Sequence, residues 1–213
     1  SESVEVRQHV FVKRSVPAAG LDIEKVLWNQ GYYYIGGVDE AGRGPLAGPV
    51  VVSGVILDPN TAEYLDVNDS KKMSESRREI LYETIISESI NYQIEILEHI
   101  EIDATNILNA TLKGMRQAVE AFLPVPDYVL IDGNRLPKLS LPAQAIVKGD
   151  QKSRSIAAAS ILAKVTRDRI MKEYDRDYPE WEFSKHKGYP TKRHKELLHK
   201  LGPTPIHRKT FRW

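Results

Sequence analysis

The 213-residue chain contains no cysteine, so it has neither a disulfide framework nor a thiolate metal site. No apolar run approaches the roughly 20 residues that a membrane-spanning helix needs. The charged N-terminal segment also lacks the apolar stretch of a signal peptide. These absences exclude a disulfide-rich secreted domain and a membrane protein. We therefore expect a cytoplasmic protein with no membrane partner.

Hydrophobic residues make up 41% of the chain, which at this length is enough for one substantial core. Apolar runs and helical patterns alternate along the sequence, and this alternation predicts an α/β fold. A short helix is also expected within 18–28, and a weaker strand pattern covers 4–12. The main strands are expected over 34–38, 49–57, 92–97 and 127–131, and the main helices over 74–88, 103–122 and 156–168.

One short segment places two acids and an arginine among glycines directly after an apolar run. The acids are Asp39 and Glu40, and Arg43 stands between Gly42 and Gly44. Neighbouring strand residues point to opposite faces, so the two acids can share a metal only if the strand ends or bends there, and the glycines supply the bend. The arginine offers several fixed donors to phosphate. The pattern indicates a metal and phosphate site; the alternative is a tight hairpin turn with a solvated charge pair.

A further acid, Asp132, ends the apolar run 127–131 and is followed by a glycine. In open α/β sheets, ligands gather beyond the carboxyl ends of the strands. Asp132 would therefore lie beside Asp39 and Glu40 if the two strands are parallel neighbours. The alternative interpretation is that Asp132 only forms a turn or caps a helix.

Asp150 precedes the N-terminus of an alanine-rich helix, for which Ser153 or Ser155 is the expected N-cap. Helix N-termini favour anions, and Lys148 adds positive charge beside this one. Asp150 is therefore a further candidate for the acidic site.

Asp168 lies on the same helix and shares a face with Ser160 and Lys164, because the three recur at every fourth position. Asp168 either reaches toward the acidic site or pairs with Lys164 on a solvated face. Both interpretations stay open at this stage.

The candidate acids have no supporting cysteines, and the six histidines are scattered without the spacing of metal ligands. Oxygen-only ligands favour Mg²⁺ or Mn²⁺ over zinc. Two such ions about 4 Å apart stabilise the attacking and leaving oxygens of a phosphoryl displacement. The acids therefore predict a metal-dependent nuclease or polymerase chemistry.

The C-terminal segment 184–213 is strongly basic. It holds nine Lys or Arg residues against one acid, Glu196, whereas the whole chain carries a formal charge of only +1. Within it, Lys185 and Lys187 precede a Gly-Tyr pair in which Tyr189 could stack on a sugar or base. The segment predicts a grip on a polyanion; the alternative is a solvated, weakly ordered face.

These blocks together resemble the bacterial form of ribonuclease HII, over roughly residues 34 to 211. Arg43 supports this class, because the sister class ribonuclease HIII usually has lysine there and carries a long N-terminal substrate-binding domain. The blocks that carry the resemblance are Gly37–Val50, Asp69–Lys72, Asp132–Gly133, Lys148–Asp150, Ser155–Asp168, His186–Tyr189 and His207–Phe211.

The resemblance implies a ribonuclease H-like mixed central sheet flanked by helices, with a small C-terminal helical appendage. It divides the chain into an extension of unknown role (1–33), a catalytic core (34–183) and a basic helical segment (184–213). The implied enzyme is an endoribonuclease, expected to be monomeric, that uses two metal ions. It would cut 5′ of a ribonucleotide at RNA–DNA junctions, in RNA/DNA hybrids or in duplex DNA, leaving 3′-hydroxyl and 5′-phosphate ends. Its role would be to remove misincorporated ribonucleotides and RNA primers.

The resemblance also assigns roles to residues. The Gly-Arg-Gly turn would contact the ribonucleotide 2′-hydroxyl, and Tyr189 would stack on the following deoxyribose. Two rivals stay open: a resolvase- or transposase-like nuclease of the same broad fold, and a noncatalytic hybrid-binding protein. The implied metal-binding acids are Asp39, Glu40, Asp132 and Asp150, with Asp168 in support, and the implied substrate contacts are Gly42, Arg43, Gly44, Lys71, Lys148, Ser155, Lys185, Lys187 and Tyr189.

Overall fold

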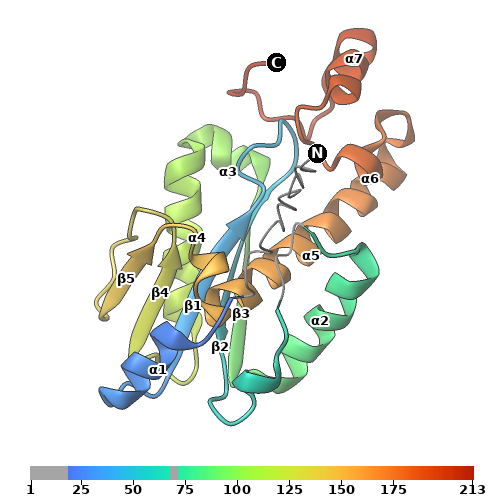
Figure 1. Cartoon of the computed structure of the whole chain (residues 1–213). Helices are drawn as coiled ribbons and strands as arrows, with labels where there is room; N and C mark the ends of the chain where they lie inside the picture. Colours follow the sequence, from blue (N-terminus) through green and yellow to red (C-terminus); the bar gives the residue numbers. More distant parts are fainter. Residues whose placement is uncertain (1–18, 68–71) are drawn as a thin grey trace, which may run out of the picture.

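A computed structural model describes residues 19–67 and 72–213, and at its centre is a five-stranded mixed sheet (Figure 1). The strand order is β3-β2-β1-β4-β5. The first three strands pair antiparallel, whereas β4 and β5 join the β1 edge in parallel. The strands are β1 (Ile35–Ala41), β2 (Val50–Ile56), β3 (Asn91–Leu97), β4 (Tyr128–Asp132) and β5 (Ala143–Ile146).

Helices cover both faces of the sheet. Helices α1, α2 and α5 pack on one face, and α4 packs on the other. The α-helices are α1 (Asp22–Asn29), α2 (Glu75–Glu88), α3 (His99–Ala104), α4 (Ile107–Ala121), α5 (Arg154–Asp177), α6 (Phe183–His186) and α7 (Lys192–Leu201), and the 3₁₀ turns are η1 (Ala62–Tyr64), η2 (Gly149–Gln151) and η3 (Pro179–Trp181).

Small residues let α5 lie directly on β1. A side chain at Gly37 would meet the backbone of Ser155 at 2.3 Å, so only glycine fits at this crossing. Ser153 is the N-cap of α5, because its hydroxyl accepts the amide of Ile156 at 3.2 Å. The helix therefore begins at a fixed place above the strand that carries the first two candidate acids.

Most predicted elements are confirmed, with two differences. The helix predicted over 103–122 corresponds to α4, which begins only at Ile107 because Asn106 caps it by accepting the amide of Asn109 at 2.8 Å; its first two predicted residues belong to the separate helix α3. The edge strand β5 was not predicted. The helix expected within 18–28 is α1, whereas the strand pattern at 4–12 and Lys71 lie outside the described residues.

The C-terminal segment is folded, which excludes the weakly ordered alternative. Helices α6 and α7 stand at one end of the sheet, beyond the last turns of α5 (Figure 1). They share an apolar cluster with the loop after β1, built around Phe183, Leu197 and Leu46. In the part of the chain that the structure describes, no helix is long and apolar enough to cross a bilayer.

Candidate active site

Three of the predicted acids meet at the carboxyl ends of β1 and β4. Asp39, Glu40 and Asp132 each offer a carboxylate oxygen, and these oxygens lie within 4.8 Å of one another. The cause is the parallel pairing of the two strands, which places Val38 opposite Ile131. The predicted convergence is confirmed.

The two adjacent acids reach one place without the bend that the sequence suggested. β1 stays paired with β2 as far as Ala41, beyond both acids, so the prediction that the strand ends or bends at them is wrong on that side. Its pairing with β4 stops at Val38. Asp39 and Glu40 are therefore held by a neighbouring strand on one side only, and their oxygens gather where the other side opens.

Burial and mutual repulsion dominate the electrostatics of the acid cluster. Burial, followed by the charges of Glu40 and Asp132, raises the pKa of Asp39 well above its ordinary value; its side chain is 5% exposed. Burial also raises the pKa of Glu40, although Arg43 opposes this at 3.8 Å. Among the described residues, Oε2 of Glu40 has no hydrogen-bond partner despite being buried. Crowded oxygen donors with an unpartnered buried oxygen fit a hard divalent cation.

Asp150 lies beside this cluster, in the turn η2. Its amide donates to Oδ1 of Asp132 at 3.2 Å, and its charge contributes to the raised pKa of Asp39. It is not one of the three acids whose oxygens lie within 4.8 Å. Its role as a fourth ligand stays a prediction.

Two adjoining pockets share Glu40 and Arg43. One, of about 400 Å³, is also lined by Gly42, Lys164 and Tyr189. The other, of about 310 Å³, runs along Asp132 and α4. The glycine-arginine turn, the predicted aromatic and the acids therefore face one continuous region.

The chain belongs to the ribonuclease HII family. The family model described as ribonuclease HII matches residues 36–213. Among curated relatives, ribonuclease HII of Clostridioides difficile strain 630 is 55% identical over 184 residues, which are 86% of this chain and 72% of the relative. Ribonuclease HII of Caldanaerobacter subterraneus subsp. tengcongensis is 54% identical over 188 residues, 88% of this chain and 78% of the relative. The chain is accordingly a metal-dependent ribonuclease H that acts on RNA/DNA substrates.

Solved structures agree with the fold. Ribonuclease H2 from Pyrococcus horikoshii OT3 superposes with a TM-score of 0.73 at 30% identity, covering 83% of this chain and 93% of that one. Ribonuclease HII from Archaeoglobus fulgidus, in a structure of its complex with PCNA, gives a TM-score of 0.70 at 27% identity over 84% and 96% of the two chains. The ribonuclease H-like mixed sheet flanked by helices is thereby confirmed.

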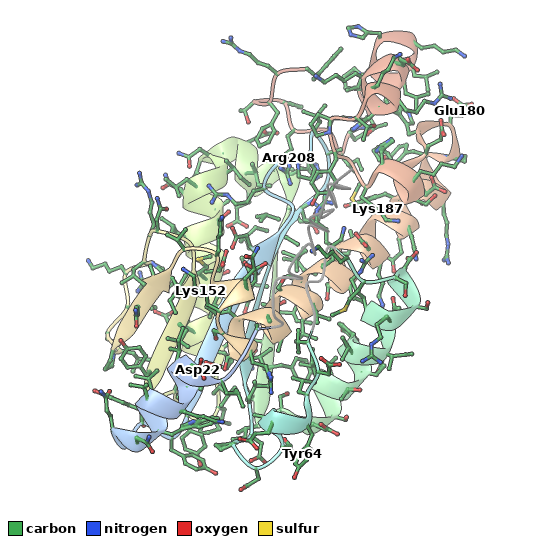
Figure 2. All side chains as sticks on the ribbon, viewed as in Figure 1. Asp22, Tyr64, Lys152, Glu180, Lys187 and Arg208 are labelled. Carbon is green, nitrogen blue, oxygen red and sulfur yellow. The ribbon has the colours of Figure 1, made fainter. Side chains whose placement is uncertain are left out.

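Two buried arginines hold the loop after β1, which includes the Gly42-Arg43-Gly44 turn, in place. Arg208 and Arg167 are each 1% exposed. Burial lowers the pKa of Arg208 to about 9 and that of Arg167 to about 10, so both keep their charge at neutral pH. Their donors go to main-chain carbonyls and not to any carboxylate within 4 Å in the described residues. Figure 2 shows Arg208 where the C-terminal segment meets the loop after β1.

Through their hydrogen bonds, the two arginines connect the Gly42-Arg43-Gly44 turn to the segment that carries Tyr189. Arg167 also lies beside the Tyr189 ring, with its guanidinium 5.4 Å from the ring centroid. Sequence reasoning gave neither arginine a role in the site: both fell within the blocks that carry the resemblance, and Arg208 was also counted in the charge of the C-terminal segment. Arg208 donates to the carbonyls of Gly42 (2.6 Å), Arg43 (3.0 Å), Pro45 (2.8 Å), Gly48 (3.0 Å) and Pro49 (3.1 Å), and Arg167 donates to those of Ala47 (2.9 Å), Pro49 (2.9 Å) and Lys187 (2.7 Å).

Asp168 is held by cations instead of joining the acid cluster. Lys164 lies 3.0 Å from its Oδ1 and Arg78 lies 3.9 Å from its Oδ2. The pairing with Lys164 that the sequence left open is therefore present, but Asp168 is only 6% exposed and not on a solvated face.

Ser155 is a correction to the predicted substrate surface. Its side chain is 1% exposed, and its hydroxyl donates to Oε2 of Glu24 at 3.1 Å. The same oxygen accepts the Ser155 amide at 3.2 Å and the Ser153 hydroxyl at 3.3 Å. Ser155 is thus held inside the protein. Glu24, which the sequence reasoning overlooked, is fully buried and joins α1 to the N-terminus of α5, and burial raises its pKa.

The predicted lysines have different surroundings. Lys148 is exposed, in a left-handed conformation next to Asp150. Lys185 is exposed and lies 3.3 Å from Glu182. Lys187 is half-buried and donates to the carbonyl of Ser184, and burial lowers its pKa. Their contacts with substrate stay predictions.

Proposed function

We propose that this ribonuclease H cuts the phosphodiester on the 5′ side of a ribonucleotide at an RNA–DNA junction, leaving a 3′-hydroxyl and a 5′-phosphate. The substrates would be RNA/DNA hybrids and DNA duplexes that contain ribonucleotides. Removal of misincorporated ribonucleotides and of RNA primers would be its role. Support comes from the family, from the acids and from the two pockets that meet at them.

Asp39, Glu40 and Asp132, with Asp150 beside them, would hold Mg²⁺ or Mn²⁺ through carboxylate oxygens. Bound divalent ions, two in this proposal, supply Lewis-acid stabilisation of the attacking and leaving oxygens. The residues of the chain fix where the scissile phosphate lies. Asp39 is buried and the other three acids are half-buried, which restricts their side chains before substrate arrives.

The Gly42-Arg43-Gly44 turn would contact the 2′-hydroxyl through its backbone, since that group distinguishes RNA from DNA at one position. Gly42 has a φ of +95°, and a side chain there would lie 2.2 Å from Nε of Arg167, so the turn has no room for one. Arg43 faces Glu40 at 3.8 Å, close enough to exchange that carboxylate for a substrate phosphate. Tyr189, on the far wall of the same pocket, would stack on the next deoxyribose.

One observation carries the proposal. Glu40, one of the three converging acids, lines the pocket whose walls include both the glycine-arginine turn and Tyr189. A metal site for cleavage and a surface able to recognise a single sugar thus lie next to each other. A general nuclease has no need of the second feature, and a noncatalytic binding protein has no need of the first.

The test is cleavage of a duplex with one ribonucleotide in one DNA strand, with Mg²⁺ or Mn²⁺, beside an all-DNA duplex of the same sequence. We expect a single cut 5′ of the ribonucleotide and none in the control. Cleavage of only longer RNA/DNA hybrids would restrict the specificity to hybrids. Equal cleavage of both duplexes would favour a resolvase-like nuclease, and tight binding without any cleavage would favour a binding protein.

A further inference from the structure

Three histidines of the C-terminal segment form one buried stack next to Tyr189. His186 on α6, His194 on α7 and His207 after α7 are 8%, 0% and 4% exposed. The rings of the first two stack with centroids 4.0 Å apart and an interplanar angle of 8°. In the sequence these histidines show no spacing of metal ligands and no sign that their rings meet, and the fold brings them together.

The hydrogen-bond partners of His186 determine which of its ring nitrogens carries the hydrogen. Its Nδ1 accepts the amide of Gly188 at 3.0 Å, so this nitrogen carries a lone pair. Its Nε2 lies 2.6 Å from the carbonyl of Trp181, which can only accept, so Nε2 carries the hydrogen. His186 is therefore neutral, in one tautomer.

The hydrogen-bond partners of His194 and His207 determine the tautomers of these two rings in the same way. Nδ1 of His194 lies 2.9 Å from the carbonyl of Tyr189, which can only accept, so Nδ1 carries hydrogen; the lone pair on its Nε2 follows from the bond that His207 donates to it. Nδ1 of His207 accepts the amide of Thr204 at 2.9 Å, so its Nε2 carries hydrogen and donates to Nε2 of His194 at 2.9 Å. Every ring nitrogen is engaged and every ring is neutral.

The surroundings favour these neutral forms. Burial lowers the pKa of all three histidines, to about 4 for His186 and His207. An added proton on any ring would set two N–H groups against each other. Each lone pair is already used by an N–H group of the protein, so the stack offers no ligand to a metal ion.

Two of these hydrogen bonds end on the backbone that carries the Tyr189 ring. His186 accepts the amide of Gly188, and His194 donates to the carbonyl of Tyr189. Gly188 has a φ of +86°, and a side chain there would lie 2.7 Å from the carbonyl of Ala47. Residues 188–189 therefore pack closely against the loop after β1, and hydrogen bonds to His186 and His194 hold their backbone.

We propose that His194 is a positioning residue for substrate recognition: its Nδ1–H fixes the backbone of Tyr189, and His207 fixes the tautomer in which Nδ1 carries that hydrogen. The inference rests on the proposed function, in which Tyr189 stacks on a sugar of the substrate. His194 touches no substrate. It acts by holding the ring of Tyr189 in the pocket beside Arg43.

A matched pair of variants tests this. In His194→Asn the side-chain amide nitrogen is as many bonds from Cβ as Nδ1 is in histidine, so it can keep the hydrogen bond to the carbonyl of Tyr189. In His194→Gln the amide is as far from Cβ as Nε2 is, so it can keep only the bond to His207. Each variant loses one of the two hydrogen bonds, so thermal unfolding should show similar midpoints. We expect KM for the ribonucleotide-containing duplex to rise at least about 5-fold in His194→Gln, the low end of a stacking contact. It should stay near that of the parent protein in His194→Asn, and kcat should change less in both variants.

The same substitutions in a Tyr189→Ala background separate the inference from the proposed function. If His194 acts through Tyr189, His194→Gln has no further effect on KM once the ring is gone. An unchanged KM in Tyr189→Ala alone would refute the stacking role and the inference with it. A raised KM in Tyr189→Ala, together with equal KM values for His194→Asn and His194→Gln, would refute the inference alone. So would a His194→Gln effect that persists without the tyrosine ring.

Discussion

The protein contains two buried clusters of charged side chains, one of acids and one of arginines. The two clusters differ in how completely hydrogen bonds within the protein satisfy them. The acids at the ends of β1 and β4 crowd one another, and an oxygen of Glu40 has no partner among the described residues. Arg167 and Arg208 are buried more deeply, yet every hydrogen bond they donate ends on a main-chain carbonyl.

This difference separates a site that needs a ligand from one that does not. Buried charge by itself does not indicate function, because hydrogen bonds to carbonyls can stabilise it completely. Crowded carboxylates with raised pKa values are costly in the free protein, and a divalent cation removes that cost. The acids should therefore respond strongly to metal, and the arginines should not.

The largest expected effect comes from Asp39→Asn. Cleavage should fall more than about 100-fold, because loss of a ligand exceeds the 10–100-fold cost of losing a group that merely orients one. The metal-free variant should nevertheless unfold about 2–4 °C higher, the shift for about 1 kcal/mol at this size, since one crowded charge is gone.

The stability gain of Asp39→Asn has a defined pH dependence. A carboxyl whose pKa is raised by folding stabilises the protein while protonated, and this contribution is lost as pH rises through the folded-state pKa. The gain should therefore grow with rising pH and shrink toward acid. Calorimetry without metal measures it, and Asp66→Asn, at an exposed position, is the control. A variant less stable than the parent at neutral pH would show that the acids are not strained by their charges.

Arg208→Met should affect stability next most strongly. It leaves buried carbonyls without donors, and we expect the free energy of unfolding to fall by about 3–5 kcal/mol. Denaturant unfolding measures this, and added Mg²⁺ should not restore the loss. Arg212→Met removes the same charge from an exposed position of the same segment. If both variants lose equal stability, the carbonyl contacts of Arg208 carry none of the effect.

Arg43→Ala should have a smaller, selective effect. A charged hydrogen bond contributes about 1.5–3 kcal/mol, so cleavage at a single ribonucleotide should fall about 10- to 100-fold. Binding to plain DNA duplex should fall much less. Competition between the two duplexes gives the ratio directly, and equal losses on both would assign Arg43 to general phosphate contact.

The smallest effect is expected from Lys185→Ala. Stability should change by less than about 0.5 kcal/mol, and the slope of log affinity against log salt should fall by about one unit if this lysine meets one phosphate. Lys25→Ala, on α1 at the other end of the molecule, is the matched control (Figure 1). An unchanged slope in Lys185→Ala would place this lysine outside the interface.

The sequence allowed prediction of the features that depend on local patterns. Strand periodicity and the positions of Asp39 and Asp132 directly after apolar runs were enough to predict that these acids converge. The helix predicted over 103–122 was placed too early at its start, because the N-cap at Asn106 begins α4 at Ile107.

The arginine contacts could not be predicted in this way. Arg208 donates to carbonyls 159 to 166 positions earlier in the chain, and a carbonyl is the same group in every residue, so it leaves no pattern in the sequence. The histidine stack likewise depends on how α6 and α7 fold back on each other. Glu24 is a similar case, since its serine partners lie 129 and 131 positions away.

The carbonyl contacts of Arg208 also bear on the order in which the protein matures during synthesis. All strands of the sheet and helix α5 precede Arg208 in the chain, so they leave the ribosome before it does. A nascent chain can thus bring its acids together while the turn beside them still lacks its clamp. Recognition of the sugar would then follow the assembly of the acids.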